Sequence, residues 1–231
     1  MIETLDSYSE YAQKTLDNYT AKDAASRYAL VEAVKNRKIR RVLDVGCGLG
    51  QDLLPFAEKT EAFCFGVDRA AEIADFAVKF FSDKGYGNRA AFARSTGESL
   101  PFADESFDIV MCRLALPYMN NNAALSEFAR VLQPDGAILL KIHAPPFYFA
   151  MIRERAKTFS PRLLAYPLIC LANGFLYQMT EKQPSGKFWQ GKEVYQTKKL
   201  LDKRLQKLRM RIEGELPDTN AQAPSFIIKK Q

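Results

Sequence analysis

The sequence predicts an α/β fold in which a mostly parallel, doubly wound sheet of seven strands ends in an antiparallel strand. Two observations predict it. Between Arg40 and His143, short β-branched runs alternate with helical patterns, and such alternation favours right-handed crossovers that place helices on both faces of a parallel sheet. Two more β-type runs, Arg209–Glu215 and Ser225–Lys230, follow as a hairpin-like pair near the C-terminus.

The composition is that of a globular protein and excludes a disordered or coiled-coil one. The chain has 231 residues, of which 47% are hydrophobic and 26% charged, which suits one domain with an inserted lid. Its four cysteines form no CxxC pair, so we expect no disulfide framework, no metal site and a cytoplasmic setting. The N-terminal segment carries acids and no long apolar core, unlike a secretory signal or a transit peptide.

Residues 1–39 are expected to form a helical cap that precedes the core. Ser9–Lys38 is rich in alanine and has apolar residues at helical spacing. A break near Asn18–Ala21 divides this stretch, so it predicts one or two helices.

The first two strands of the core are each followed by a helix. Arg40–Gly46 (RRVLDVG) is a β-branched run that ends in glycine, and Asp52–Lys59 reads as a helix. Ala62–Asp68 (AFCFGVD) predicts a second strand that ends in an acid. Ala70–Gly85 predicts an amphipathic helix, which Gly85 terminates.

Three more strands complete the core over residues 40–143. Ala90–Arg94 and Phe107–Cys112 predict the third and fourth strands. Asn121–Leu132 predicts a helix closed by a turn at Gln133–Gly136, whose proline and glycine suit a tight bend. Ala137–His143 (AILLKIH) predicts a fifth strand buried on both faces.

Residues 144–192 are longer than a simple crossover and rich in aromatic side chains. We therefore expect a helical, aromatic insert that forms a lid over a substrate. Residues 193–231 are expected to form a helix at Glu193–Leu208 and the last two strands of the same domain.

A glycine-rich loop carries the clearest functional signal. Gly46, Gly48 and Gly50 directly follow the first strand, and Asp68 ends the second strand, where a carboxylate can accept both hydroxyls of a ribose. The spacing differs from the GxGxxG loop that binds a pyrophosphate, and acidic residues, Asp44 among them, flank the loop. This pattern indicates a nucleoside site that suits a cation better than a phosphate.

These residues also resemble a known family. VLDVGCGLG at residues 42–50 is similar to the first motif of the class I S-adenosylmethionine-dependent methyltransferases. GESLPFADESFDIVMC at 97–112 and RVLQPDGAILL at 130–140 are similar to later motifs, the second of them in the ubiquinone and menaquinone methyltransferase subgroup. The resemblance covers about residues 40–142 and implies a Rossmann-like fold, with S-adenosylmethionine as cofactor and S-adenosylhomocysteine as product.

The resemblance implies a set of cofactor-binding residues at the ends of the strands and in the loops that follow them. They are Asp44, Gly46, Cys47, Gly48, Gly50, Asp68, Arg69, Thr96, Gly97, Glu98, Arg113 and Leu114. Thr96 stands where the family commonly has an acid near the adenine, so the adenine contact falls to Thr96 or to the backbone of Gly97. Arg113 is expected to pair with a carboxylate of the cofactor or of a substrate.

Fewer residues are candidates for contact with the molecule that accepts the methyl group. His143 is the single histidine and lies at the end of the fifth strand, where ligands bind in open α/β sheets; it is either a general base or a structural or substrate-binding group. Tyr118, Phe147 and Tyr148 are candidate substrate contacts, with packed aromatic side chains as the alternative.

The favoured function is methyl transfer to oxygen or carbon of a small hydrophobic or aromatic acceptor, because the insert is aromatic. The alternatives are methylation of RNA or protein, and cofactor binding without catalysis. Residues 153–211 hold 14 Lys and Arg against 4 Asp and Glu, which motivates the RNA or protein hypothesis, although we consider a nucleic acid the less favoured partner. Leu163–Met179 could lie on an anionic membrane surface, or form a cap packed on the sheet.

Overall fold

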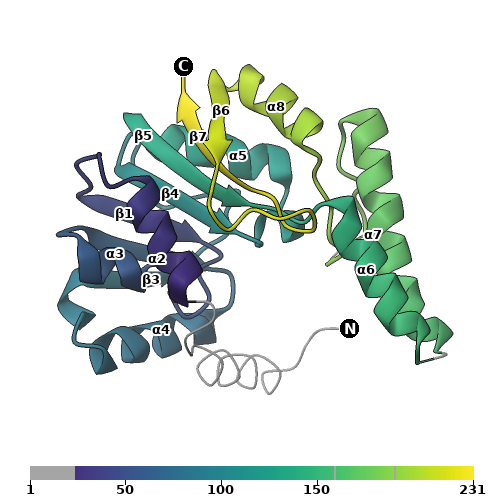
Figure 1. The fold of residues 1–231 in the computed structure, drawn as a ribbon, viewed down its shortest axis with the longest axis horizontal. Helices are drawn as coiled ribbons and strands as arrows, with labels where there is room; N and C mark the ends of the chain where they lie inside the picture. The colour runs from purple at the N-terminus through teal and green to yellow at the C-terminus, as the bar shows by residue number, and fades with distance from the viewer. Residues whose placement is uncertain (1–23, 159, 190) are drawn as a thin grey trace.

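The computed structural model describes residues 24–158, 160–189 and 191–231 (Figure 1). The expected helical region before residue 24 lies outside this part of the chain, as does the expected break at Asn18–Ala21. The first described helix is α2 (Ala24–Ala33), directly before the sheet.

One seven-stranded sheet in the order β3-β2-β1-β4-β5-β7-β6 organises the fold. Neighbours among the first five strands pair in parallel, and β7 pairs antiparallel with both β5 and β6. The strands are β1 (Arg41–Val45), β2 (Phe63–Asp68), β3 (Ala90–Arg94), β4 (Phe107–Arg113), β5 (Leu132–Lys141), β6 (Met210–Glu215) and β7 (Ser225–Lys230). The predicted fold class is confirmed, including the antiparallel last strand.

Helices pack on both faces of the sheet because alternate strand residues are apolar on both sides. Val110 of β4 faces one core, and its neighbours Ile109 and Met111 face the other. The first core contains side chains of α5 (Asn121–Val131) and α8 (Lys198–Lys207), and the second contains those of α2, α3 (Leu54–Lys59) and α4 (Ala71–Asp83).

The predicted insert is helical. It contains α6 (Pro145–Ala156) and α7 (Pro161–Thr180), which form a hairpin at one end of the molecule, beside the sheet rather than over it (Figure 1). Two short 3-10 turns, η1 (Gly87–Arg89) and η2 (Leu116–Tyr118), precede β3 and follow β4.

Three of the differences between predicted and observed boundaries affect the carboxyl edge of the sheet or the strands beside it. The expected turn at 133–136 belongs to β5, which begins at Leu132 beside a register shift in β4. The helix expected from Asp52 begins at Leu54, because the Asp52 side chain is held in ion pairs instead. The helix expected from Glu193 begins only after Thr197, whose hydroxyl caps Leu200 N–H.

Residues 193–196 form a buried, non-helical segment instead of the first helical turn. The backbone N–H of Val194 donates to Pro117 O at 2.9 Å, and that of Gln196 donates to His143 O at 3.1 Å. This segment therefore links η2, the end of β5 and the insert, and it brings Glu193 to the carboxyl edge of the sheet.

Candidate active site at the carboxyl edge

The glycine loop after β1 has the backbone conformation that its glycines permit. Gly46, Gly48 and Gly50 all have positive φ angles, of 76°, 50° and 75°. Gly46 N–H donates to Val67 O at 2.8 Å, so the loop crosses the end of β2. A Cβ on Gly50 would lie 2.8 Å from ring atoms of Phe81 and Phe92.

Asp68 lies beside this loop, at the end of β2. Its carboxylate accepts hydrogen bonds from Gly48 N–H at 3.2 Å and from Ala70 N–H at 3.1 Å. The structure thus brings together the glycine loop and the acid that the sequence places 20 residues apart. A ligand that binds both would contact the backbone of the glycine loop on one side and this carboxylate on the other.

Asp44 is a buried carboxylate directly before the loop. It is 2% exposed, and Oδ1 has no hydrogen-bond partner among the described residues. Burial and the charge of Asp52 raise the pKa of Asp44 well above its ordinary value, while Arg113 opposes the shift. A buried acceptor without a donor suits a ligand that presents an N–H or a positive charge.

Thr96, Gly97 and Glu98 lie in the loop after β3, and Arg69 directly follows β2. Gly97 is buried, Thr96 is exposed and bridges to Ser99, and the side chain of Arg69 lies on the surface. Glu98 Oε1 accepts from the Asn120 backbone N–H at 2.7 Å. This bond ties the loop after β3 to the start of α5.

Arg113, at the end of β4, pairs with carboxylates of the chain itself. Its Nε lies 3.2 Å from Asp52 Oδ2 and its Nη2 2.5 Å from Asp218 Oδ2. We expected Arg113 to pair with a carboxylate of the cofactor or of a substrate. Both partners instead come from other loops of the chain, because the 216–224 connection packs onto this edge. Arg113 Nη1 is buried without a partner among the described residues.

Asp218 extends this network and was not singled out in the sequence. It also accepts from Lys141 Nζ at 2.6 Å. Burial would raise the pKa of Asp218, but the hydrogen bonds and charges of Arg113 and Lys141 outweigh it and lower the pKa to about 2. Leu114, with φ +64°, donates its N–H to Lys141 O, so the ends of β4 and β5 stay together at this point.

His143 follows β5 by two residues, and Glu193 holds its imidazole. Nδ1 lies 2.7 Å from Glu193 Oε2, and the ring stacks on Phe147 at 3.9 Å between centroids. Glu193 also accepts from the hydroxyls of Tyr148, at 2.8 Å, and Tyr166, at 2.6 Å. The carboxylate therefore binds groups from the end of β5, from α6 and from α7.

This arrangement determines which imidazole nitrogen can act as a base. A carboxylate accepts, so Nδ1 carries the hydrogen and Nε2 has the free lone pair. Burial would raise the pKa of Glu193, but the hydrogen bonds from His143, Tyr166 and Tyr148 outweigh it and lower the pKa. Glu193 thus stays ionised at neutral pH, and no described group hydrogen bonds Nε2.

The remaining acceptor candidates divide into two groups. Tyr118 is half exposed on η2 and Phe147 is partly exposed, so both can contact a ligand. Tyr148 is fully buried and its hydroxyl is held by Glu193, which corrects the expected substrate contact to a supporting position. Glu193 itself was not predicted as a site residue. The only feature of the sequence that could have indicated it is that an acidic residue stands beside apolar residues after the insert.

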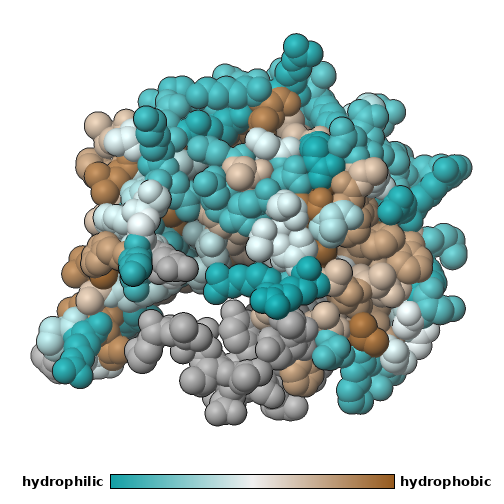
Figure 2. Space-filling view, turned by 180° about the vertical axis from the view of Figure 1, so that it is seen from behind, coloured by the Kyte–Doolittle hydropathy of each residue, from teal (hydrophilic) through white to brown (hydrophobic). Residues whose placement is uncertain are grey.

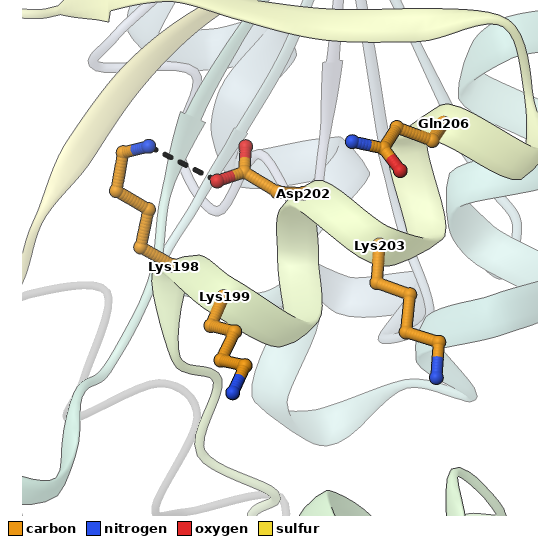
Figure 3. A pocket seen from close by; sticks show the side chains of 5 residues that line it. All are labelled: Lys198, Lys199, Asp202, Lys203 and Gln206. Carbon is orange, nitrogen blue, oxygen red and sulfur yellow. Dashed lines mark hydrogen bonds and ion pairs between the residues drawn. The ribbon is translucent and has the colours of Figure 1, made fainter.

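A separate open depression lies along α8, away from these groups (Figure 3). Its side chains are Lys198, Lys199, Asp202, Lys203 and Gln206, and Lys198 pairs with Asp202 at 3.0 Å. None of the predicted site residues lines it. The carboxyl edge, with its buried carboxylates and imidazole, is therefore the better candidate for chemistry.

Comparisons with known proteins agree with this geometry. A family model described as a methyltransferase domain matches residues 42–136. The uncharacterized methyltransferase YcgJ of Bacillus subtilis is 36% identical over 140 residues, 60% of this chain and 54% of that protein. The ubiquinone/menaquinone biosynthesis C-methyltransferase UbiE of Geotalea daltonii is 28% identical over 129 residues, 54% of this chain and 55% of that protein.

Two solved structures share the fold. The crystal structure of YcgJ from Bacillus subtilis aligns with a TM-score of 0.61 and 21% identity, covering 90% of this chain and 99% of that one. Magnesium protoporphyrin IX methyltransferase from Synechocystis, solved with bound SAH, aligns with a TM-score of 0.62 and 15% identity over 100% of this chain and 89% of that one. The chain spans about half the length of the two curated relatives it matches here.

Proposed function

We propose that the protein is a class I S-adenosylmethionine-dependent methyltransferase that transfers a methyl group to oxygen or carbon of a small hydrophobic or aromatic acceptor. The match of residues 42–136 to a methyltransferase-domain family model and the 36% identity to a methyltransferase over 140 residues support this proposal. Bound S-adenosylmethionine would supply the methyl group from a positively charged sulfur.

The observation that carries the proposal is the buried Asp44 carboxylate beside the glycine loop. Its Oδ1, which has no hydrogen-bond partner in the described part of the chain, fits the amino group of S-adenosylmethionine, which is a cationic donor. Asp68, at the edge of the same loop, is proposed to accept the two ribose hydroxyls. Gly46, Gly48 and Gly50 hold the loop at positive φ angles, and we propose that the backbone of this loop contacts the ligand.

His143 is proposed as the general base for an acceptor that must lose a proton. Glu193 holds Nδ1, so Nε2 can take the proton from a hydroxyl or an acidic carbon while the methyl group is transferred. The remaining acceleration comes from aligning the acceptor and excluding water. Phe147 and Tyr118, on either side of this edge, are proposed to contact the acceptor. The relatives' names include both a C-methyltransferase and a tocopherol O-methyltransferase.

The first test is calorimetric titration of the protein with S-adenosylmethionine and S-adenosylhomocysteine. Asp68→Ala is expected to weaken binding roughly 10- to 100-fold, because it removes charge-assisted hydrogen bonds. Asp75→Ala, at an exposed position of α4, is the matched control and should bind like the wild type. A wild type that binds neither compound, or an Asp68→Ala variant that binds equally well, would refute the proposed site.

The second test offers a labelled methyl donor to panels of hydroxylated aromatic and lipophilic compounds. Label in such a compound supports the proposal. The lysines of α8 favour one competing candidate, methylation of RNA, so total RNA is included in the panel; label in RNA, with salt-dependent binding, would overturn the small-molecule assignment. Cofactor binding without any labelled product would favour a non-catalytic protein.

A further inference from the structure

The outward side of α7 is apolar along its whole length. Six of its exposed positions recur every three or four residues, which is the spacing of one helix face. They are Pro161, Ala165, Leu168, Ala172, Phe175 and Met179. Leu168, Phe175 and Met179 are 53%, 58% and 69% exposed. We call these six residues the α7 stripe; contiguous apolar surface of this kind marks an interaction site in a protein that is otherwise polar outside.

The opposite side of α7 makes specific contacts with the rest of the protein, so the stripe is the solvent-facing side of this helix and not an exposed core face. Asn173 Nδ2 donates to Glu193 O at 3.2 Å, and Tyr166 donates to the Glu193 carboxylate. Gly174 lies so close to the Tyr195 ring that a Cβ there would lie 2.1 Å from it. These contacts fix the rotation of α7 and leave the stripe facing solvent among the described residues.

Positive charge surrounds the stripe at the tip of the hairpin. Arg153 and Lys157 are exposed at the end of α6, and Arg162 is the single charged residue of α7. Glu154 is the only acid between positions 153 and 162. Figure 2 shows hydrophobic atoms along the outer side of this hairpin and hydrophilic atoms at its tip.

We propose that the α7 stripe docks the protein on an anionic lipid membrane, with α7 parallel to the surface. Apolar side chains along one helix face would enter the acyl boundary, while Arg153, Lys157 and Arg162 meet the headgroups. By length and composition alone α7 could also cross a membrane. The buried polar contacts of Asn173 and Tyr166 argue against this, because crossing would break them.

The proposal does not depend on the proposed methyl transfer, but the two would act together. A peripheral position brings the His143 edge, which Glu193 joins to α7, next to lipophilic molecules in the bilayer. Titration with S-adenosylhomocysteine reads the cofactor site independently, so failure of one proposal is distinguishable from failure of the other.

The test is flotation of the full chain with vesicles of phosphatidylcholine alone and of phosphatidylcholine mixed with phosphatidylglycerol. We expect binding to the anionic vesicles that weakens with salt and is at least about 10-fold weaker without phosphatidylglycerol. Phe175→Glu should reduce binding roughly 10- to 100-fold, the effect of losing one buried aromatic side chain. Val78→Glu, at an exposed apolar position of α4, is the matched control and should bind like the wild type.

Three results would overturn the proposal. The first is a wild type that does not float with anionic vesicles, and the second is a Phe175→Glu variant that floats as well as Val78→Glu. The third is a wild type that dimerises without vesicles and that Phe175→Glu turns monomeric, because the stripe would then bind a second copy of this chain. Unfolding curves and S-adenosylhomocysteine affinity, measured for both variants, show whether each is folded.

Discussion

At the scale of single residues, the sequence indicates some site groups directly and others not at all. The sequence predicts Gly46, Gly48 and Asp68 as site residues, because their expected roles depend on backbone conformation and on the end of a strand, both of which are local features. Glu193 is different: it meets His143 across 50 residues. An acid there suits the first turn of a helix equally well, so its contact with His143 could not be predicted from the sequence.

His143 and Glu193 give a prediction about the rate of methyl transfer. His143→Gln should lower kcat about 100-fold or more with a hydroxyl acceptor, because it removes the base. Glu193→Gln should lower it less, about 10-fold, because the amide oxygen can still accept from Nδ1. Both variants should bind S-adenosylhomocysteine with wild-type affinity, as measured by calorimetry. An unchanged kcat for His143→Gln would make the histidine a structural group instead.

Gly50 gives a prediction about stability, with Gly85 as its control. Gly85 has φ +83° and open space around it, whereas a Cβ on Gly50 would collide with Phe81 and Phe92. Gly85→Ala should therefore cost about 1 kcal/mol, from backbone strain alone. Gly50→Ala should cost about 2–4 kcal/mol, because overpacking adds to a similar strain. Urea unfolding measures both, and equal losses would mean that the two rings move aside.

At the scale of elements, the strands were predicted more accurately than the segments that join them. β1 and β2 begin and end within one residue of the expected bounds, because β-branched and apolar runs with glycine or acid ends are local signals. The helix expected at 193–208 begins five residues later, at Lys198, because the preceding segment forms tertiary contacts instead. Glu193, Val194 and Gln196 form hydrogen bonds with other elements instead.

The connection between β6 and β7 gives a prediction about acid stability. Asp218 ionises with a pKa of about 2 in the folded protein and near 4 in an unfolded chain. Because the pKa is lower in the folded protein, the ionised carboxylate stabilises the fold at pH values above the unfolded pKa. This stabilisation is lost as the pH falls through the folded pKa. Asp218→Asn should therefore lower the free energy of unfolding by about 2 kcal/mol at pH 7, and flatten its decline between about pH 4 and 2.

Urea unfolding at a series of pH values tests this prediction. Asp75→Asn is the control, since Asp75 is exposed on α4, and its pH dependence should match that of the wild type. A curve for Asp218→Asn that stays parallel to the wild type would show that Arg113 and Lys141 do not stabilise this carboxylate in solution.

At the scale of the whole molecule, the sheet could be predicted and the position of the insert could not. Alternating strands and helices leave few topologies, because crossovers are right-handed and parallel sheets are covered on both faces. The composition of 144–192 indicated a helical, aromatic insert, but its orientation depends on contacts between distant segments. Glu193 with Tyr166, and Gly174 with Tyr195, determine it, and no local pattern signals either pair.

This difference predicts that the α6–α7 hairpin opens independently of the sheet. Removing the hydroxyls in a Tyr148→Phe, Tyr166→Phe double variant breaks one bond from each helix of the hairpin to Glu193 and leaves the contact between His143 and Glu193 in place. Amide hydrogen exchange in residues 145–180 should become at least about 10-fold faster, because bonds to a charged acceptor are lost. Peptides from β1 and β5 should exchange as in the wild type, and Tyr86→Phe, next to α4, should change neither region. Exchange that accelerates equally in the α6–α7 hairpin and in the sheet would instead mean that the two open as one cooperative unit.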